Sequence, residues 1–237
     1  MNFDLLGFGA KGWGLQLLQG MGMTVLVAVS AYVLGLVLGG AAAACKLSGH
    51  RGGRVAADAY TTIVRGVPSL LVIYLLFFGG ASAAAWVANL LGFNGPVELS
   101  ALPVGILAVG TVSGAYSAEV LRGGALAVPQ GQLEAAKALG MGRWLTFSRI
   151  HLPQTLRYAL PGLGNVWQLT LKDTSLVSVV ALVELMRVAY LAQGATRQPF
   201  LFFTTAGVLY LVLAGVSGRL FAWAEARTTR GVRRAAR

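Results

Sequence analysis

Residues 134–153 read EAAKALGMGRWLTFSRIHLP, a basic and polar stretch in a chain whose other long segments are apolar. Three apolar runs precede this stretch and two follow it. A membrane-spanning helix needs about 20 mostly apolar residues. The runs cover residues 21–45, 68–91, 99–117, 160–185 and 200–223. Because the polar stretch separates the third run from the fourth, it lies outside the bilayer. The sequence therefore predicts an all-α, polytopic membrane protein with five transmembrane helices.

The composition supports the same class of protein. The 237 residues are 56% hydrophobic and 11% charged, whereas about 25% of the residues of an average soluble domain are charged. Neither a repeat nor a linker divides the chain, so we expect one domain over residues 1–237. Glycines four residues apart, Gly35 with Gly39 and Gly110 with Gly114, favour close approach of the first and third helices.

The basic residues predict the orientation of the chain. Fifteen of the 19 lysines and arginines follow the first or third run or lie at or after the end of the fifth, while Lys11, Arg187 and Arg197 lie on the other side. Connections rich in lysine and arginine stay in the cytoplasm. We therefore expect a periplasmic N-terminus, a cytoplasmic C-terminus and a cytoplasmic loop over about residues 118–159. Binding of nucleic acid would need a basic, aromatic soluble face, and no soluble domain is predicted to hold one.

The chain lacks the residue patterns of an enzyme or a metal site. Cys45 is the only cysteine, and His50 and His151 have no partners at metal-ligand spacing. No set of nucleophile, base and orienting acid can be assembled from the cytoplasmic segments, and no Gly-x-x-x-x-Gly-Lys-Ser/Thr phosphate loop is present. We expect a non-catalytic chain that binds no metal and no cofactor.

The long loop is predicted to contain two short helices. Residues 132–139 are good helix formers, Glu134 suits the N-terminal end, and Gly140 is placed to stop the helix. A second helix is expected over residues 141–151, with an apolar stripe of Trp144, Phe147 and Ile150. It should end at Leu152-Pro153, because the residue before proline disfavours helix.

Two roles fit this hairpin equally well on chemistry alone. The small side chains of Ala135 and Ala136, beside Leu139, leave a smooth surface that another protein can approach. Alternatively, the hairpin could lie on the inner membrane surface with Arg143 and Arg149 on lipid phosphates.

A family resemblance favours the first role. Residues 105–185 resemble the polar amino-acid permeases of ATP-binding-cassette importers, and further matching segments extend the likeness over nearly the whole chain. The branch that takes up histidine, lysine, arginine, ornithine or opines is most similar, through residues 61–68 and 157–162. The segments that carry the resemblance are GAYSAE at 114–119, RGG at 122–124, VPQGQ at 128–132, the spacing within 134–153, LKDTSL at 171–176, RGVP at 65–68 and GLGNVW at 162–167.

The resemblance implies the type I ABC importer permease fold with a cytoplasmic coupling helix between helices three and four. In such permeases this helix docks in a cleft of a cytoplasmic ATPase. Carried over to this chain, the contact is made by Glu134, Ala135, Ala136 and Gly140. The bracing residues of the loop are then Ile150, Leu152 and Pro153.

The resemblance also implies the partners and the location. The permease would work with a dimer of ABC ATPases that uses ATP-Mg, with a second permease subunit (identical or paralogous) and with a periplasmic amino-acid-binding protein. It would lie in the bilayer of the bacterial inner membrane.

Charged side chains in the fourth run mark a candidate substrate path. Lys172 and Asp173 stand beside Thr174 and Ser175 in an apolar run, and charges at membrane depth usually face protein or water. Asp173 is a candidate to hold a cationic substrate. The alternatives are a structural network near a helix irregularity, or an outer helix end.

Glu119 and Arg122 lie three residues apart at the inner end of the third run, a spacing typical of a helical ion pair. The pair could act as a local brace or as a gate.

These observations predict the permease subunit of an ATP-driven importer that moves polar amino acids, basic ones in particular, or opines by alternating access. A permease for another polar amino acid and a membrane scaffold without a transport path are the alternatives.

Overall fold

The computed structural model describes residues 3–9, 12–90, 100–180 and 182–228, and every secondary-structure element in these ranges is helical. The all-α prediction is confirmed for the part of the chain that the structure describes. The elements are η1 (Phe3–Leu6), α1 (Gly14–Leu47), α2 (Arg51–Gly66), α3 (Ser69–Tyr74), η2 (Leu75–Gly79), α4 (Gly80–Leu90), α5 (Ala101–Leu126), α6 (Gln130–Ala138), α7 (Arg143–Thr146), η3 (Phe147–His151), α8 (Leu152–Asp173), η4 (Thr174–Val180), α9 (Leu185–Thr196) and α10 (Pro199–Thr228).

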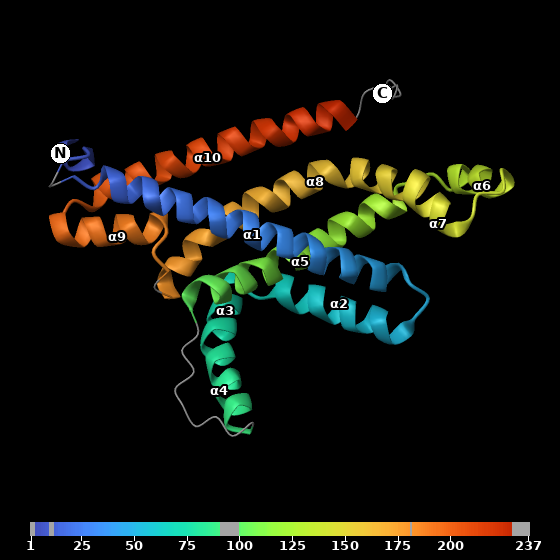
Figure 1. Ribbon diagram of the computed structural model, residues 1–237, viewed down its shortest axis with the longest axis horizontal. Helices are drawn as coiled ribbons and strands as arrows, with labels where there is room; N and C mark the ends of the chain where they lie inside the picture. The colour runs from blue at the N-terminus through green and yellow to red at the C-terminus, as the bar shows by residue number, and fades with distance from the viewer. Residues whose placement is uncertain (1–2, 10–11, 91–99, 181, 229–237) are drawn as a thin grey trace.

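Long helices run side by side along the longest axis of the molecule. Figure 1 shows α1, α5, α8 and α10 lengthwise, with α6 and α7 at one end and α9 beside the N-terminus at the other. We call these the coupling end and the α9 end. Helices α3 and α4 project sideways from the middle. By length and composition, α1, α5 and α10 can each cross a membrane, and two bent helix pairs raise the number of candidate spans to five.

Glycines allow α1 and α5 to pack closely, as the sequence predicts. A Cβ atom at Gly35 would lie 2.6 Å from Ser113 Oγ, and one at Gly39 would lie 2.6 Å from Ser117 Cβ. A Cβ at Gly110 would lie 3.1 Å from the carbonyl oxygen of Ala31. Without a side chain at these positions, the two backbones come close enough for small residues to form the interface.

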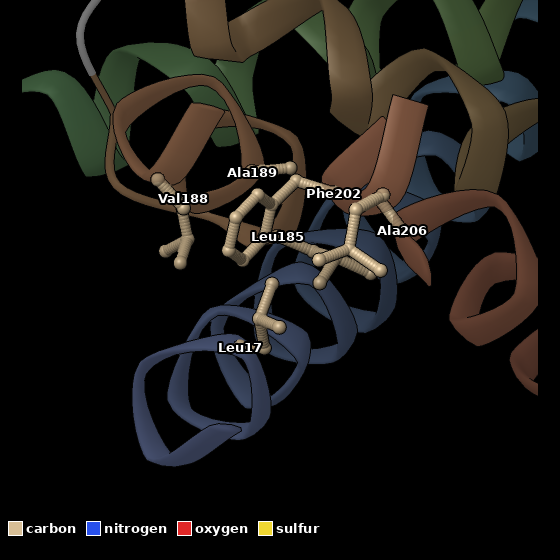
Figure 2. Close-up of a cluster of buried hydrophobic side chains, with 8 residues drawn as sticks. Leu17, Leu185, Val188, Ala189, Phe202 and Ala206 are labelled. Atoms are coloured by element: carbon tan, nitrogen blue, oxygen red, sulfur yellow. The ribbon is translucent and has the colours of Figure 1, made fainter. Parts of the chain in front are cut away.

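At the α9 end, apolar side chains join three helices. Leu17 of α1 contacts Leu185 and Val188 of α9 and Phe202 of α10 in a buried cluster (Figure 2). Phe202 and Leu185 are fully buried there. This cluster fixes the short helix α9 between two long helices.

The second span differs from the prediction of one helix over residues 68–91. A 16-residue helix, α2, precedes it and meets the α3–η2 segment at a bend of 113°. Helix α2 carries four charged residues on one face, so its sequence is too polar to be found by an apolar-run criterion. Its buried residues are Ala57 and Thr61.

The fourth span also has different bounds, and the predicted helix end at Leu152-Pro153 is wrong. Helix α8 begins at Leu152, with Pro153 in its first turn, and continues directly from η3. Pro153 stands where the π turn of η3 changes to the α-helix, so its missing N–H falls at a change in the hydrogen-bond pattern. At its other end α8 changes to the 3₁₀ helix η4 at Thr174, so a helix irregularity does adjoin Lys172 and Asp173.

Candidate functional site

Helix α6, residues Gln130–Ala138, ends as the sequence predicts. Gly140 has φ of +76°, and its N–H donates to the Lys137 carbonyl at 2.9 Å. The N–H of Met141 donates to the Ala136 carbonyl at 3.0 Å. This pair of hydrogen bonds around a left-handed glycine is the Schellman motif, which closes a helix and turns the chain sharply.

The predicted docking residues of α6 differ in exposure. Glu134, Ala135 and Gly140 are exposed, whereas Ala136 is 3% exposed. A Cβ atom at Gly140 would meet nothing within 4 Å. The outer surface of α6 is therefore open and smooth. Glu134 lies in the middle of the helix and not at its N-terminal end as predicted, because α6 begins at Gln130.

After Gly140 the chain forms an aromatic stripe that differs from the predicted one. Trp144 and Phe147 lie with ring centroids 5.8 Å apart, and Phe147 stacks on His151 at 6.2 Å. Residues Phe147–His151 form a π-helical turn, which is wider than an α-helical turn by one residue. His151 therefore takes the place in the stripe that Ile150 would have in an α-helix, and Ile150 is half-buried.

A shallow cavity of about 210 Å³ lies between α6 and the aromatic stripe. Leu133, Met141 and Phe147 line it, with Lys137 and Arg143 beside them. Leu139 and Trp144 are 82% and 76% exposed, so large apolar side chains remain uncovered in this region. We call residues 130–151 the coupling segment.

The base of the coupling segment is tightly packed. A Cβ at Gly124 of α5 would lie 2.7 Å from the Thr155 carbonyl oxygen of α8. Gln154 of α8 donates a hydrogen bond to Gln132 of α6. Leu152 and Pro153, predicted to brace the loop, are exposed at the start of α8.

Glu119 and Arg122 form the ion pair that their spacing predicts, and it belongs to a larger cluster. Arg122 NH2 lies 3.0 Å from Glu119 Oε2. The other oxygen of Glu119, Oε1, pairs with Lys46 at the end of α1. Lys46 Nζ also lies 2.9 Å from Asp58 Oδ1. Arg65 NH1 stands 4.0 Å from the same Glu119 oxygen. Sequence reasoning treated Lys46 as a loop cation and missed its central place.

The four candidate path residues separate at the end of α8. Lys172 is exposed, and Asp173 is half-buried with the Ser69 side chain of α3 as its polar partner. Thr174 is fully buried, within 3.4 Å of the Tyr210 hydroxyl of α10. Ser175 donates to the Lys172 carbonyl at 2.7 Å. Only Lys172, Asp173 and Ser175 therefore retain contact with the surface.

A buried acid that sequence reasoning missed lies near this region. Glu184 is 0% exposed and accepts hydrogen bonds from the N–H groups of Met186 and Arg187, which begin α9. Thr24 and Tyr210 also donate to it, at 3.1 and 2.9 Å. A glutamate at the edge of an apolar run was the available signal.

Metal binding is not suggested by the described residues, among which no group of three His, Cys, Asp or Glu side chains could hold an ion.

Comparisons with known proteins give one answer. The family model described as "Binding-protein-dependent transport system inner membrane component" matches residues 31–230. The nopaline transport system permease protein NocQ of Agrobacterium fabrum is 51% identical, over 98% of this chain and 99% of its own length. The octopine transport system permease protein OccQ of Rhizobium radiobacter is 52% identical over 98% of each chain. The histidine/lysine/arginine/ornithine permease protein HisQ of Escherichia coli is 40% identical over 94% of this chain and 98% of its own.

A solved structure described as an amino acid ABC transporter with histidines has 28% sequence identity and a TM-score of 0.77. It covers 91% of this chain and 95% of its own.

Proposed function

This chain belongs to the family of binding-protein-dependent transport system inner membrane components, and from that premise we propose that it is the permease subunit of an ATP-driven importer of opines or basic amino acids. The observation that carries the proposal is the identity of 51–52% to nopaline and octopine permease proteins along almost the entire chain. The identity to the histidine/lysine/arginine/ornithine permease is 40%. The substrate we therefore favour is an opine, with basic amino acids second.

In this proposal the permease does not hydrolyse ATP itself. A separate pair of ATP-binding-cassette ATPases binds ATP-Mg and docks on the coupling segment. Three features support that contact. They are the exposed surface of α6, the Schellman turn at Gly140, and the uncovered side chains of Leu139 and Trp144. Large exposed apolar side chains rimmed by charge are typical of protein interaction sites.

We propose that the coupling end lies in the cytoplasm and the α9 end in the periplasm. Lys46, Arg51, Arg54 and the basic residues of the coupling segment gather at one end, whereas Arg187 and Arg197 lie at the other. This separation supports the orientation because positive connections are retained in the cytoplasm. The whole chain forms one transmembrane permease domain in the bacterial inner membrane.

The substrate path requires a second permease subunit and a periplasmic binding protein. Lys172 is exposed on a span, and a charge at membrane depth must face water or another protein rather than lipid. A second permease, identical or paralogous, that covers this side would enclose a path. Asp173 is proposed to receive the cationic group of the substrate there.

Uptake by the reconstituted complex tests the function. Proteoliposomes would hold the permease, its partner permease and the ATPases, with binding protein outside and ATP inside. We expect ATP-dependent accumulation of labelled octopine or nopaline, with arginine and histidine as competitors. Stable assembly without uptake of any of the four solutes would favour a scaffold. Uptake of a neutral polar amino acid alone would refute the substrate assignment but keep the transport function.

A further inference from the structure

We infer that Lys46 is a positioning residue that couples the ATPase to the substrate path, because it holds α2 onto α1 and onto the last third of α5, the helix that leads into the coupling segment. This inference rests on the proposed function. It goes beyond that function by assigning a part in energy transfer to an ion cluster outside the docking surface and outside the path. The cluster consists of Lys46, Asp58, Thr61, Arg65, Glu119 and Arg122.

Each of the three N–H donors of the Lys46 ammonium group has an acceptor within the cluster. Its side chain is 6% exposed, and an ammonium group has three N–H donors. Nζ lies 2.6 Å from Thr61 Oγ1 and 2.9 Å from Asp58 Oδ1, both on α2, and it donates to Glu119 Oε1 on α5. One atom at the end of α1 thus joins three helices.

Small side chains supply the apolar packing of α2, because Ala57 lies in a buried cluster with Ala42 of α1 and Ala118 of α5, and Tyr60 packs against it. The buried residues of this 16-residue helix are Ala57 and Thr61, both small. The Tyr60 hydroxyl adds a hydrogen bond to the Thr111 carbonyl at 2.7 Å, and Arg65 lies over the Tyr116 ring at 5.4 Å. The attachment of α2 therefore combines this small apolar cluster with polar contacts, among them those of Lys46 with Thr61 and Asp58.

Two mechanical connections lead from the coupling segment to Asp173. The first is α8, which continues from η3 and ends at Asp173. The second starts at α5, which is separated from α6 by only Ala127, Val128 and Pro129, with Val128 4% exposed. It passes through Glu119 and Lys46 to α2, and from there across the 113° bend to Ser69, the polar partner of Asp173.

The two connections meet at the contact between Ser69 and Asp173. If the ATPases move the coupling segment, α8 follows directly because the helix is continuous. Helices α2 and α3 follow through the contacts of α2 with α5, among which Lys46 forms the most buried ionic link. Loosening that link should let ATP hydrolysis proceed without the matching movement of α3, so the predicted defect is in coupling and not in assembly.

Four variants test the inference in proteoliposomes that contain the ATPases and the partner permease. Lys46→Met removes the central cation, Glu119→Gln removes its partner on α5, and the double variant removes both. Lys46→Arg keeps the charge but replaces a compact three-donor group with a planar fork. Arg54→Met is the matched control, because Arg54 is an exposed cation of α2 that contacts the Ser48 carbonyl and not the cluster.

The readout is the number of ATP molecules hydrolysed per solute imported. Lys46→Met and Glu119→Gln should raise it roughly 2- to 30-fold, the range over which residues outside both sites change coupling. The double variant should raise the ratio by less than the product of the two single effects, because both changes remove the shared contact between Lys46 and Glu119. Lys46→Arg should give a ratio between those of Lys46→Met and the unmodified permease. Arg54→Met should give the same ratio as the unmodified permease.

An unchanged ratio in assembled Lys46→Met or Glu119→Gln complexes would overturn the inference. So would loss of assembly in all the cluster variants, Lys46→Arg included, because that result assigns the cluster a structural role only. Failure of the proposed function itself looks different, since the unmodified complex would then import no solute or bind no ATPase.

Discussion

The Tyr210 hydroxyl of α10 donates a hydrogen bond to Glu184 Oε2 at 2.9 Å. The same carboxyl oxygen accepts from Thr24 of α1 and from the backbone of Met186, so a single buried acid joins three helices. Its other oxygen accepts from the N–H of Arg187, which completes the cap of α9. Buried polar groups are stable only when their partners are present. The position of α9 between α1 and α10 therefore depends on this set of bonds as well as on the apolar cluster of Figure 2.

Tyr210→Phe tests that dependence. The change keeps the ring but removes one of four donors to Glu184, and we expect a loss of about 0.5–2 kcal/mol of stability. The measurement is the temperature at which half of the detergent-solubilised protein stays monodisperse after heating. Tyr190→Phe is the control, because Tyr190 is 54% exposed on α9 and its ring would remain near Arg187. An equal midpoint for both variants would contradict the structural role of the Tyr210 hydroxyl.

Adjacent glycines of α1 should respond oppositely to alanine. A Cβ at Gly39 would lie 2.8 Å from the Gly114 carbonyl oxygen, so Gly39→Ala must push α5 away, at a cost of about 1–3 kcal/mol. A Cβ at Gly40 meets nothing within 4 Å, and alanine favours helix over glycine by up to about 1 kcal/mol. Gly40→Ala should therefore leave the melting midpoint equal or higher. Similar midpoints for the two variants would mean that α1 and α5 are less close than described.

Gly140 should tolerate residues according to backbone conformation rather than size. Its φ of +76° disfavours a β-branched residue, while asparagine adopts the left-handed region more readily. Gly140→Val should fray the end of α6 and reduce ATPase binding roughly tenfold, and Gly140→Asn should have a smaller effect. Binding is measured by titrating fluorescent ATPase onto the reconstituted permease. Tighter binding by the valine variant than by the asparagine variant would show that the Schellman turn is unimportant.

Patterns along the chain predicted the parts of the fold that depend on local physics. Helices α1 and α10 are long and apolar enough to be read directly, and the turn at Gly140 needs a residue that adopts positive φ. Glu119 and Arg122 pair because one helical turn places them together.

Features that arise from contacts between distant segments were not predictable in this way. From the sequence, Lys46 is a loop cation, and its three acceptors become apparent only when α2 and α5 are folded against α1. The charged face of α2 also prevents an apolar-run criterion from finding that helix. Glu184 reads as a boundary residue until Tyr210 and Thr24 surround it. The residue before a proline usually ends a helix, but Leu152 and Pro153 instead begin α8, which continues from the π turn of η3.

Asp173→Asn separates the two roles left open for this residue. If the carboxylate holds the cationic group of the substrate, its loss should raise the arginine or octopine concentration for half-maximal uptake by roughly tenfold or more, because an opposite charge is removed. Ser69→Ala is the matched control, since it removes the partner hydroxyl of Asp173 and leaves the charge in place. A structural network would predict the same loss from both variants, together with a lower melting midpoint. An unchanged half-maximal concentration in a well-folded Asp173→Asn permease would remove Asp173 from the substrate path, and Lys172 and Ser175 would then be the path residues to examine next because both reach the surface.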